Sequence, residues 1–493
     1  MKRQFKIFSL LIVCILTMQS CEKWFDVTAT DQIKAEDQFA STDGYRDALT
    51  GVYLAMGEQS LYGKDMTYNM IDMLAQQYTT FANLALYYNM QRFDYSNVRS
   101  EAQIQSMWNK FYFAIANINN AIEHLDKSKL QWSEGEKQII KGELLGLRAF
   151  LHFDLMRVFG HSDYANRSSL ADVMAIPYSR TYSKDYVPQE TYLKTFELME
   201  KDINEALSLL VYDPIKKNTS LSNSAFADIN RDGFYSKRNN RMNYYAVKAL
   251  QARVLAWQGT GDKLRQAAES AEEVIADSNL QLLRDNVNLS INKTILSEHV
   301  FGLKVTKLAS IVNPLLEGSS NTEYNALRIP VSLAEDVYEA SDPSIGPSDV
   351  RFNTLLSSET MGMISVKLRQ LNGNHTDYNT IPLMKLPEMY YIAAEYYSKN
   401  NLTKAISLVQ AVRASRRIAE PLPMSLTLED FEKELQKEYR KEYVSEGQLF
   451  FYYKRKGVTP LPNYSTAVTA DDKIYMLPFP KSEIEFGNRV QAW

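Results

Sequence analysis

Apolar residues recur at steps of three and four over much of this chain of 493 residues. One such stripe covers residues 104–125, and a second covers 140–158, just before Gly160. This spacing places apolar side chains on one face of an α-helix, and a glycine after the last apolar position is a common helix stop. Further helices are predicted over 42–56 and 191–210. The sequence therefore predicts a mostly α-helical protein.

Two later segments have the layout of helix–turn–helix repeats. Residues 243–277 contain a turn at Gly259, and residues 387–417 contain one near Asn400. Their length and pattern are similar to tetratricopeptide units of about 34 residues. The two segments are not contiguous in sequence, so a simple solenoid is not expected. We predict stacked helix pairs that form one wall of a larger domain.

Irregular segments separate the predicted helices. They cover 212–241, 279–330, 341–382 and 456–493, and none has a helical or strand period. Long loops in a compact chain are usually functional or held by other parts of the fold. We expect ligand binding on such segments. Residues 435–455 alternate in charge and are predicted to form one salt-bridged helix that packs by one face.

The N-terminus has the layout of a secretory signal peptide. A basic start precedes an apolar run over 7–18, and Ser20 then precedes Cys21. The apolar run is shorter than the roughly 20 residues that a membrane span needs. A cysteine after a small residue is similar to the bacterial lipobox, so we predict a signal peptide over 1–20 and acylation of Cys21, for example by palmitate. The alternative is an ordinary signal peptide with an incidental cysteine.

No residue pattern points to a catalytic, metal or nucleic-acid site. The formal net charge is −4, and no basic stripe is present that would follow a phosphate backbone. Residues 228–233, "DINRDG", match the first half of a calcium loop, but Asn239 stands where the bidentate carboxylate belongs. An Asx-rich turn is the alternative. No cofactor or metal is expected, although abundant carboxylates leave a glycosidase-like pair open.

One poorly periodic segment is rich in aromatic residues. Residues 76–95, "QQYTTFANLALYYNMQRFDY", combine six aromatic side chains with amides and charges. Aromatic faces pack against the flat C–H patches of sugars, while amides and carboxylates bind the hydroxyls. The alternative is that these tyrosines pack beneath a loop. The predicted ligand-binding residues are Asp72, Tyr78, Asn83, Tyr87 and Tyr88.

Six segments occur in order along the chain: "SCEKWFDV", "MNYYAVKALQARVLAWQGTGD", "EHVFGLKV", "LPEMYYIAAEYY", "EYRKEYVSEGQLFFYYKRKG" and "YMLPFPKSEIEFGN". From residue 21 to the C-terminus, this series resembles the SusD/RagB family of Bacteroidetes outer-membrane lipoproteins. The resemblance implies a mostly helical fold in which tetratricopeptide-like pairs support an irregular, loop-rich ligand-binding face. It implies an N-terminal region over 21–215 and a C-terminal region over 216–493 within one intertwined body.

The resemblance also implies a function and a partner. Such proteins are non-enzymatic, lipid-anchored receptors on the cell surface that bind an oligosaccharide, or a peptide in some members. They pass it to a TonB-dependent SusC-like transporter in the outer membrane, and no nucleic acid is involved. Two alternatives stay open at this point: a surface glycoside hydrolase on a helical scaffold, and a periplasmic scaffold that holds protein partners with its repeats.

Overall fold

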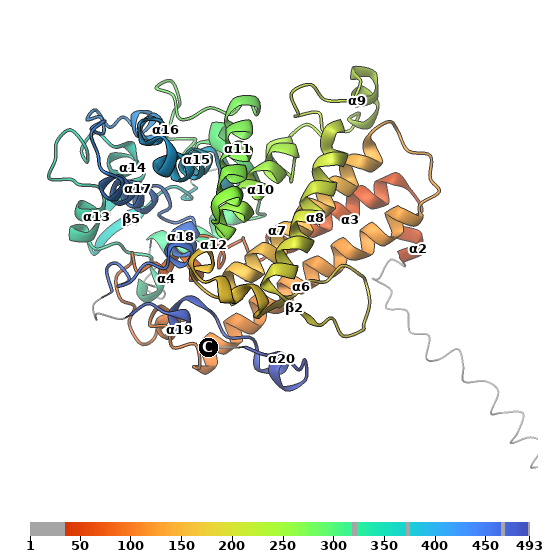
Figure 1. The fold of residues 1–493 in the computed structure, drawn as a ribbon, viewed down its shortest axis with the longest axis horizontal. Helices are drawn as coiled ribbons and strands as arrows, with labels where there is room; N and C mark the ends of the chain where they lie inside the picture. Colours follow the sequence, from red (N-terminus) through yellow and green to blue (C-terminus); the bar gives the residue numbers. More distant parts are fainter. Residues whose placement is uncertain (1–34, 318–322, 371–374, 465–468, 492–493) are drawn as a thin grey trace, which may run out of the picture.

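The computed structural model describes residues 35–317, 323–370, 375–464 and 469–491. These residues form a mostly helical body with few strands, as predicted (Figure 1). The predicted signal peptide over 1–20 and the acylation site Cys21 lie outside the described residues. Of the helices in these ranges, none has the length and apolar character that a membrane span requires.

Eight helices form a row of four antiparallel pairs. Within the pairs, α3 packs on α6, α7 on α8, α10 on α11 and α15 on α16. The pairs also contact one another in turn, through α6 and α7, α8 and α10, and α11 and α15 (Figure 1). The tetratricopeptide-like pairs are therefore present. Their bounds are α3 Thr42–Met56, α6 Val98–Lys127, α7 Glu136–Phe159, α8 Tyr192–Leu209, α10 Tyr244–Gln258, α11 Gly261–Asp277, α15 Leu386–Asn400 and α16 Leu402–Ser415.

Side-chain caps set the ends of several of these helices. The side chains of Asn97, Thr191 and Asn243 accept hydrogen bonds from backbone N–H groups in the first turns of α6, α8 and α10. Such caps satisfy donors that the helix itself leaves unpaired. At the other end of α10, Gly259 takes a left-handed conformation with φ +63°. The predicted turn at this glycine is therefore confirmed.

The prediction of one helix over 435–455 is wrong. The chain forms α17 (Leu428–Glu442) and α18 (Gln448–Lys456), with a break between them. Gly447 has φ +71°, a conformation that glycine adopts without a steric penalty. A Cβ atom at Gly447 would lie 2.5 Å from the carbonyl oxygen of Thr67. The close approach of a distant segment therefore requires glycine here and interrupts the helix.

Charged residues near the C-terminal end of α17 are buried, although Glu429 and Lys433 in its first half are exposed. Glu438 pairs with Arg351 at 2.9 Å and with Arg413 at 3.2 Å, and Glu442 pairs with Arg416 at 2.9 Å. All five of these paired side chains are at most 2% exposed. Buried charges are tolerated when each has an oppositely charged partner. The alternating charges of this segment therefore join α17 to the rest of the core.

Short helices and strands occupy the segments between the long helices. The strands form three two-stranded antiparallel sheets, β1 with β2, β3 with β6 and β4 with β5. The segments predicted to be irregular thus contain short regular elements. Their bounds are α2 Ala35–Gln38, α4 Met70–Leu74, α5 Tyr88–Gln91, η2 Tyr164–Asn166, η3 Ser168–Asp172, β1 Met174–Pro177, β2 Gln189–Thr191, η4 Leu210–Tyr212, α9 Asn223–Ile229, η5 Arg238–Asn240, η6 Leu296–Glu298, β3 His299–Lys304, α12 Leu308–Glu317, η7 Glu323–Asn325, α13 Val331–Val337, α14 Val350–Asn353, β4 Leu356–Glu359, β5 Gly362–Ser365, β6 Thr380–Lys385, α19 Asp472–Tyr475 and α20 Lys481–Glu485.

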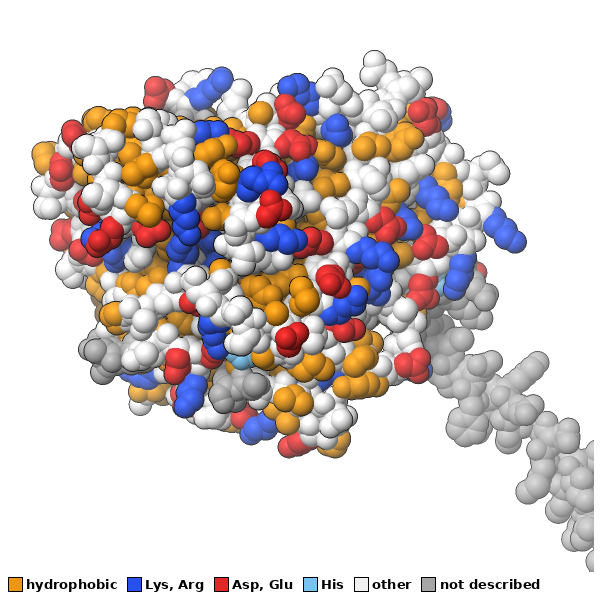
Figure 2. Space-filling model, in the orientation of Figure 1, with side chains coloured by type: hydrophobic (Ala, Val, Ile, Leu, Met, Phe, Trp, Pro, Cys, Tyr) orange, Lys and Arg blue, Asp and Glu red, His pale blue; other side chains and the backbone are white. Residues whose placement is uncertain are grey.

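One hydrophobic core extends through most of the described chain. Leu49, Phe111, Leu250, Ile392 and Tyr453 all belong to it, and each is at most 2% exposed. The core therefore crosses the boundary that was predicted between residues 215 and 216, and the division into two regions stays a prediction. On the face in view, acidic and basic side chains are interspersed among apolar ones (Figure 2).

Candidate functional site

The aromatic segment 76–95 lies against a second segment far along the chain. The backbone N–H of Thr79 donates to the carbonyl oxygen of Arg328 at 2.7 Å, and that of Leu86 donates to Asn325 Oδ1 at 3.0 Å. Leu86 is 47% exposed and Tyr324 is 42% exposed. This surface is therefore assembled from two parts of the chain and has apolar side chains in contact with solvent.

Asp72 and Tyr78 form a buried pair. The Tyr78 hydroxyl donates to the Asp72 carboxylate, and the backbone N–H groups of Ser445 and Gly447 each donate to it at 2.9 Å. Asp72 is 1% exposed. Burial raises the pKa of Asp72 to about 6, and the three donors act in the opposite direction. The pair therefore joins α4 to the break between α17 and α18, and neither side chain is open to a ligand in this conformation.

The other three predicted residues divide between buried and accessible positions. The hydroxyl of buried Tyr87 donates to Asp65 Oδ1 at 2.6 Å. Tyr88 is half-buried, with the guanidinium of Arg92 3.8 Å from its ring centroid, and Asn83 is exposed. Packing beneath a loop, the alternative given for the tyrosines, therefore describes Tyr78 and Tyr87, because a buried carboxylate needs hydroxyl donors. Ligand contact by Asn83 and Tyr88 stays a prediction.

The acidic residues of 228–233 are held by arginines. Arg231 pairs with Asp228 at 2.5 Å, and Arg46 pairs with Asp232 at 3.1 Å. In the ranges that the structure describes, no group of three or more His, Cys, Asp or Glu side chains is arranged to hold a metal ion. Asp228 lies at the end of α9 and Asp232 in the turn that follows, and ion pairs account for both carboxylates.

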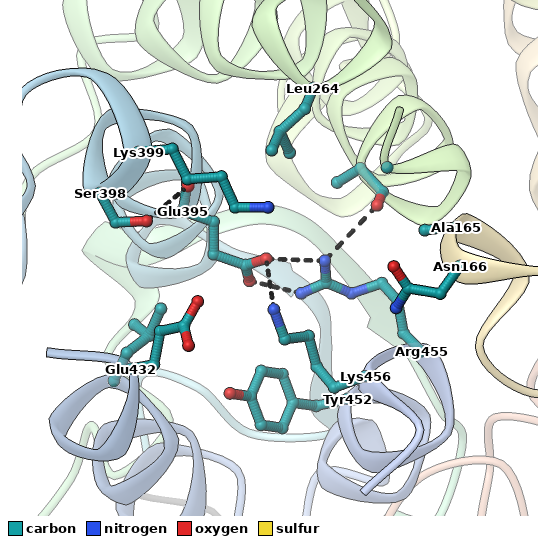
Figure 3. Close-up of a pocket in the computed structure, with 13 residues that line it drawn as sticks. Ala165, Asn166, Leu264, Glu395, Ser398, Lys399, Glu432, Tyr452, Arg455 and Lys456 are labelled. Carbon is teal, nitrogen blue, oxygen red and sulfur yellow. Dashed lines mark hydrogen bonds and ion pairs between the residues drawn. The ribbon is translucent and has the colours of Figure 1, made fainter. Parts of the chain in front are cut away.

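A narrow pocket lies between α10, α15 and α18 (Figure 3). Its volume is about 90 Å³, and Glu395 and Arg455 form a bidentate pair at its centre, with Lys456 3.8 Å from the same carboxylate. Burial raises the pKa of Glu395, but the charges of Arg455 and Lys456 outweigh it and bring the value to about 2. The charged groups at the centre of the pocket bind one another, so the pocket is a structural contact with room for little more than water.

A larger hollow is formed by three segments that are distant in sequence. We call it the aromatic hollow. It has a volume of about 440 Å³ and is lined by α6, by the end of β1 with the loop that follows it, and by α20 with the segment after it. Three aromatic side chains at its wall are solvent-exposed, namely Phe113 at 54%, Tyr182 at 56% and Tyr186 at 57%. Large exposed aromatic rings gathered at a concavity are unusual on a protein surface and indicate a binding site.

Neighbouring contacts hold parts of this wall in place. The guanidinium of Arg489 lies 4.6 Å from the ring centroid of Tyr186, and its Nη1 donates to the carbonyl oxygen of Val187. The backbone N–H of Tyr182 donates to Glu123 Oε1 at 2.7 Å. The aromatic hollow therefore has a preformed wall, which lowers the entropy cost of binding.

Polar side chains complete the lining of the aromatic hollow. Asn109, Ser179, Asp185 and Glu483 lie among the aromatic residues. Asp185 accepts from Ser183, and Glu483 accepts from Arg489 at 3.1 Å. Hydroxyl and amide groups beside flat rings can recognise a polyhydroxylated ligand, because the rings contact its C–H faces and the polar groups bind its hydroxyls.

The sequence-based search missed the residues of this hollow. Phe113 stands off the apolar stripe of 104–125, so an aromatic ring on the polar face of a helix was the available signal. Tyr182 and Tyr186 lie in the polar stretch "RTYSKDYVPQ". The hollow itself depends on contact between α6 and the C-terminal segment, which no local pattern reveals.

Comparisons with known proteins found a similar family model and similar folds. Residues 24–235 match the SusD-like family model that is described as "Starch-binding associating with outer membrane". A SusD superfamily protein from Bacteroides thetaiotaomicron has a TM-score of 0.69 at 22% identity, over 92% of this chain and 99% of that one. Residues 24–235 are therefore similar to the SusD-like family, and the fold is that of solved SusD superfamily structures. Phe113, Tyr182 and Tyr186 all fall within the matched residues of this SusD-like chain.

Other solved structures share the fold. A putative sugar binding protein from Bacteroides vulgatus has a TM-score of 0.68 at 21% identity, over 90% of this chain and 96% of that one. Surface glycan-binding protein A from Bacteroides thetaiotaomicron, solved in complex with laminarihexaose, has a TM-score of 0.67 at 16% identity, over 91% of this chain and 99% of that one. No curated protein matches the sequence. The SusD-like fold therefore covers nearly the whole chain.

Proposed function

We propose that this SusD-like chain binds a nutrient oligosaccharide in the aromatic hollow. The observation that carries the proposal is the gathering of exposed Phe113, Tyr182 and Tyr186 around a volume of about 440 Å³. A pyranose ring presents C–H groups on its faces, so it packs against such rings, while hydroxyls at its edge bind Asn109 or Asp185. A hollow of this size takes a short stretch of a glycan chain.

Relatives with the same fold support a glycan ligand. Surface glycan-binding protein A, which shares the fold, was solved with laminarihexaose, and the family model carries the description of starch binding. These ligands belong to those proteins. For this chain they support an oligosaccharide as the ligand class.

We further propose that the protein acts as an anchored receptor and not as an enzyme. Acyl groups on Cys21 would hold the body on the outer membrane at the cell surface, since each buried CH₂ contributes roughly 0.8 kcal/mol. The partner would be a TonB-dependent SusC-like transporter that receives the bound glycan. A receptor tethered beside its transporter works with modest affinity, because tethering raises the effective concentration of ligand at the pore.

The test is a binding and turnover assay with the full chain in detergent. The panel contains neutral β-glucan, α-glucan and mannan oligosaccharides, with laminarihexaose among them, and calorimetry measures affinity while chromatography of the incubated sugars detects products. We expect at least one neutral oligosaccharide to bind and every sugar to be recovered intact. Release of shorter products would instead support the glycoside hydrolase alternative. Absence of binding across the panel would contradict the proposal.

A further inference from the structure

A second hollow differs from the first in its charge. We call it the basic hollow. Its volume is about 350 Å³, and it is lined by the end of α3, by residues 233–241 and by the end of β3 with Thr306. Three cationic side chains line it, Lys237, Arg241 and Lys304, and none of its described lining residues is acidic. The charge of this lining is therefore opposite in sign to the net charge of −4 of the whole chain.

The charge of Arg241 is balanced outside the hollow. Arg241 Nη1 lies 3.5 Å from Glu143 Oε2, and Glu143 is also paired with buried Arg238. Arg238 pairs in addition with Asp213 at 2.6 Å. Two arginines therefore face two carboxylates in this buried group, so it contributes no net charge to the hollow. The positive charge of the hollow comes from its two lysines.

Both lysines are exposed and lack acidic partners in the described parts of the chain. Lys304 is the last residue of β3, and its Nζ donates to the carbonyl oxygen of Tyr378 at 2.6 Å. That neutral acceptor holds the ammonium group in position and leaves its charge uncompensated. Lys237 directly precedes η5 and makes no ion pair within those ranges. The ammonium groups of Lys237 and Lys304 are thus both available to an anion.

Lys237 and Lys304 line the same hollow, and the positive charge of Lys237 acts on Lys304. The pKa of Lys304 lies below its ordinary value because of burial and because of the positive charge of Lys237, while Asp377 acts in the opposite direction. An anion between the two lysines would relieve this repulsion, and low-dielectric walls strengthen the attraction.

Apolar and aromatic side chains form the remaining wall. Leu54 is 58% exposed, and the half-buried ring of Phe234 is stacked by the guanidinium of Arg241 at 3.9 Å from its centroid. Tyr53 is also in the lining, and its hydroxyl donates a hydrogen bond to Glu143 that fixes the ring. The basic hollow therefore combines a rigid apolar surface with two cations, and its small volume suits one or two sugar units.

We infer that the basic hollow binds an anionic saccharide, with its carboxylate or sulfate group between Lys237 and Lys304 and its ring against Phe234 and Leu54. This inference rests on the proposed saccharide-binding function and adds a second site, for acidic sugars. A nucleic acid fits less well, because the sequence has no basic stripe that would follow a phosphate backbone.

The experiment uses the full chain in detergent and three probes. Oligogalacturonate carries carboxylates, a chondroitin sulfate oligosaccharide carries sulfates as well, and laminarihexaose is neutral. Calorimetry at low and at physiological ionic strength measures each affinity. We expect at least one acidic probe to bind, with weaker binding at higher salt. The Lys237→Ala/Lys304→Ala variant is expected to lose about tenfold or more in affinity for that probe, since two charge-assisted hydrogen bonds are removed.

Matched variants separate a site effect from a change of net charge. Lys194→Ala/Lys433→Ala removes two exposed lysines from α8 and α17 and should leave the affinity unchanged. Lys237→Arg/Lys304→Arg keeps both charges and should retain binding. Equal losses in the two alanine variants, or no acidic probe bound by the unmodified chain, would overturn the inference. Binding of oligogalacturonate assigns the site to carboxylates, and binding of the sulfated probe alone assigns it to sulfates.

The result is distinguishable from failure of the aromatic hollow. If neutral glycans bind and acidic probes do not, only the basic hollow is refuted. If acidic probes bind in a manner that depends on Lys237 and Lys304 while neutral glycans fail, the basic hollow stands and the aromatic hollow is refuted.

Discussion

The backbone N–H of Gly447 donates a hydrogen bond of 2.9 Å to the carboxylate of Asp72, a residue 375 positions earlier in the chain. The N–H of Ser445 donates to the same carboxylate. The break between α17 and α18 is therefore held by the segment that leads into the aromatic stretch 76–95. A substitution at Asp72 or at the break is therefore expected to perturb both of these segments.

Gly447→Ala is expected to destabilise the protein by about 2 kcal/mol or more. A Cβ atom at this position would lie 2.5 Å and 2.6 Å from the carbonyl oxygens of Thr67 and Met66, and φ is +71°. Gly51→Ala is the matched control. Gly51 is exposed within α3 with nothing within 4 Å of the added carbon, so its variant should gain up to about 1 kcal/mol. Urea unfolding of both variants measures the difference, and equal stabilities would contradict it.

Tyr78→Phe is expected to lower the free energy of unfolding by about 1–3 kcal/mol, because the buried Asp72 carboxylate loses a donor. Tyr88→Phe should change it little, since the Tyr88 hydroxyl makes no hydrogen bond within the described residues. A comparable loss in Tyr88→Phe would argue against the buried pair as the cause.

The effect of Tyr78→Phe should depend on pH. The pKa of Asp72 is about 6 in the fold, above its ordinary value of 3.8, so folding favours the protonated carboxyl. The protonated Asp72 carboxyl therefore contributes its full stability below about pH 4, and this contribution is lost as the pH rises through 6. Removal of the Tyr78 hydroxyl raises the pKa of Asp72 further, so the variant should lose more stability at pH 8 than at pH 4. Chemical denaturation at the two pH values checks this.

The buried acidic residues predict acid sensitivity of the whole fold. Glu395 and Glu438 each have a pKa of about 2, below the ordinary 4.5, because nearby cations outweigh the effect of burial. Their contribution is present above about pH 4.5 and is lost as the pH falls toward 2, by about 3 kcal/mol for each group.

The loss can be traced to one carboxylate by substitution. Glu395→Gln should be less stable than the unmodified chain at pH 7, because Arg455 loses its charged partner. On acidification, the variant should lose less stability than the unmodified chain does. Glu429→Gln changes an acidic residue that is 80% exposed and should follow the unmodified chain at every pH. Parallel acid-unfolding curves for Glu395→Gln and the unmodified chain would contradict this account.

Substitutions in the aromatic hollow test the glycan site. Tyr186→Ala and Phe113→Ala should each weaken binding of a neutral glycan about three- to tenfold, since a ring contact is lost. Phe486→Ala is the control, because this ring is 85% exposed and lies outside the lining. Tyr88→Ala probes the surface of the aromatic segment. A loss in Tyr88→Ala with none in Tyr186→Ala would move the site to residues 76–95.

Cys21→Ser tests the anchor. The unmodified protein should sediment with membranes and carry acyl groups by mass spectrometry, whereas the variant should appear in the soluble fraction. Retention of the variant on membranes, after a salt wash, would contradict lipid anchoring at this residue.

Much of the helical content could be predicted because helix periodicity is local. The stripe over 104–125 lies within α6, and the turn at Gly259 ends α10 as expected. Burial of charge was not predicted. The alternating charges of 435–455 are typical of a solvated helix, and only the arrangement of Arg351, Arg413 and Arg416 around them makes a buried network.

The sequence predicted the type of side chain in the candidate site, aromatic rings beside polar groups, but not their positions. Tyrosines and carboxylates of residues 72–88 pointed to ring stacking, but Tyr78 and Tyr87 are hydrogen-bonded to Asp72 and Asp65 in the interior. The exposed rings lie instead at Phe113, Tyr182 and Tyr186. Composition predicts which side chains are available, whereas exposure depends on what packs above each one.

The sequence by itself determined the helices, the turn at Gly259 and the family resemblance, because these depend on residues that are close along the chain. The tertiary structure alone decided that α11 and α15 meet across the intervening residues 278–385, that Asp72 faces Gly447, and that three distant segments enclose a hollow. Burial and pairing of this kind arise from contacts between residues far apart in the chain, and such contacts leave no periodic signal in either partner's own sequence.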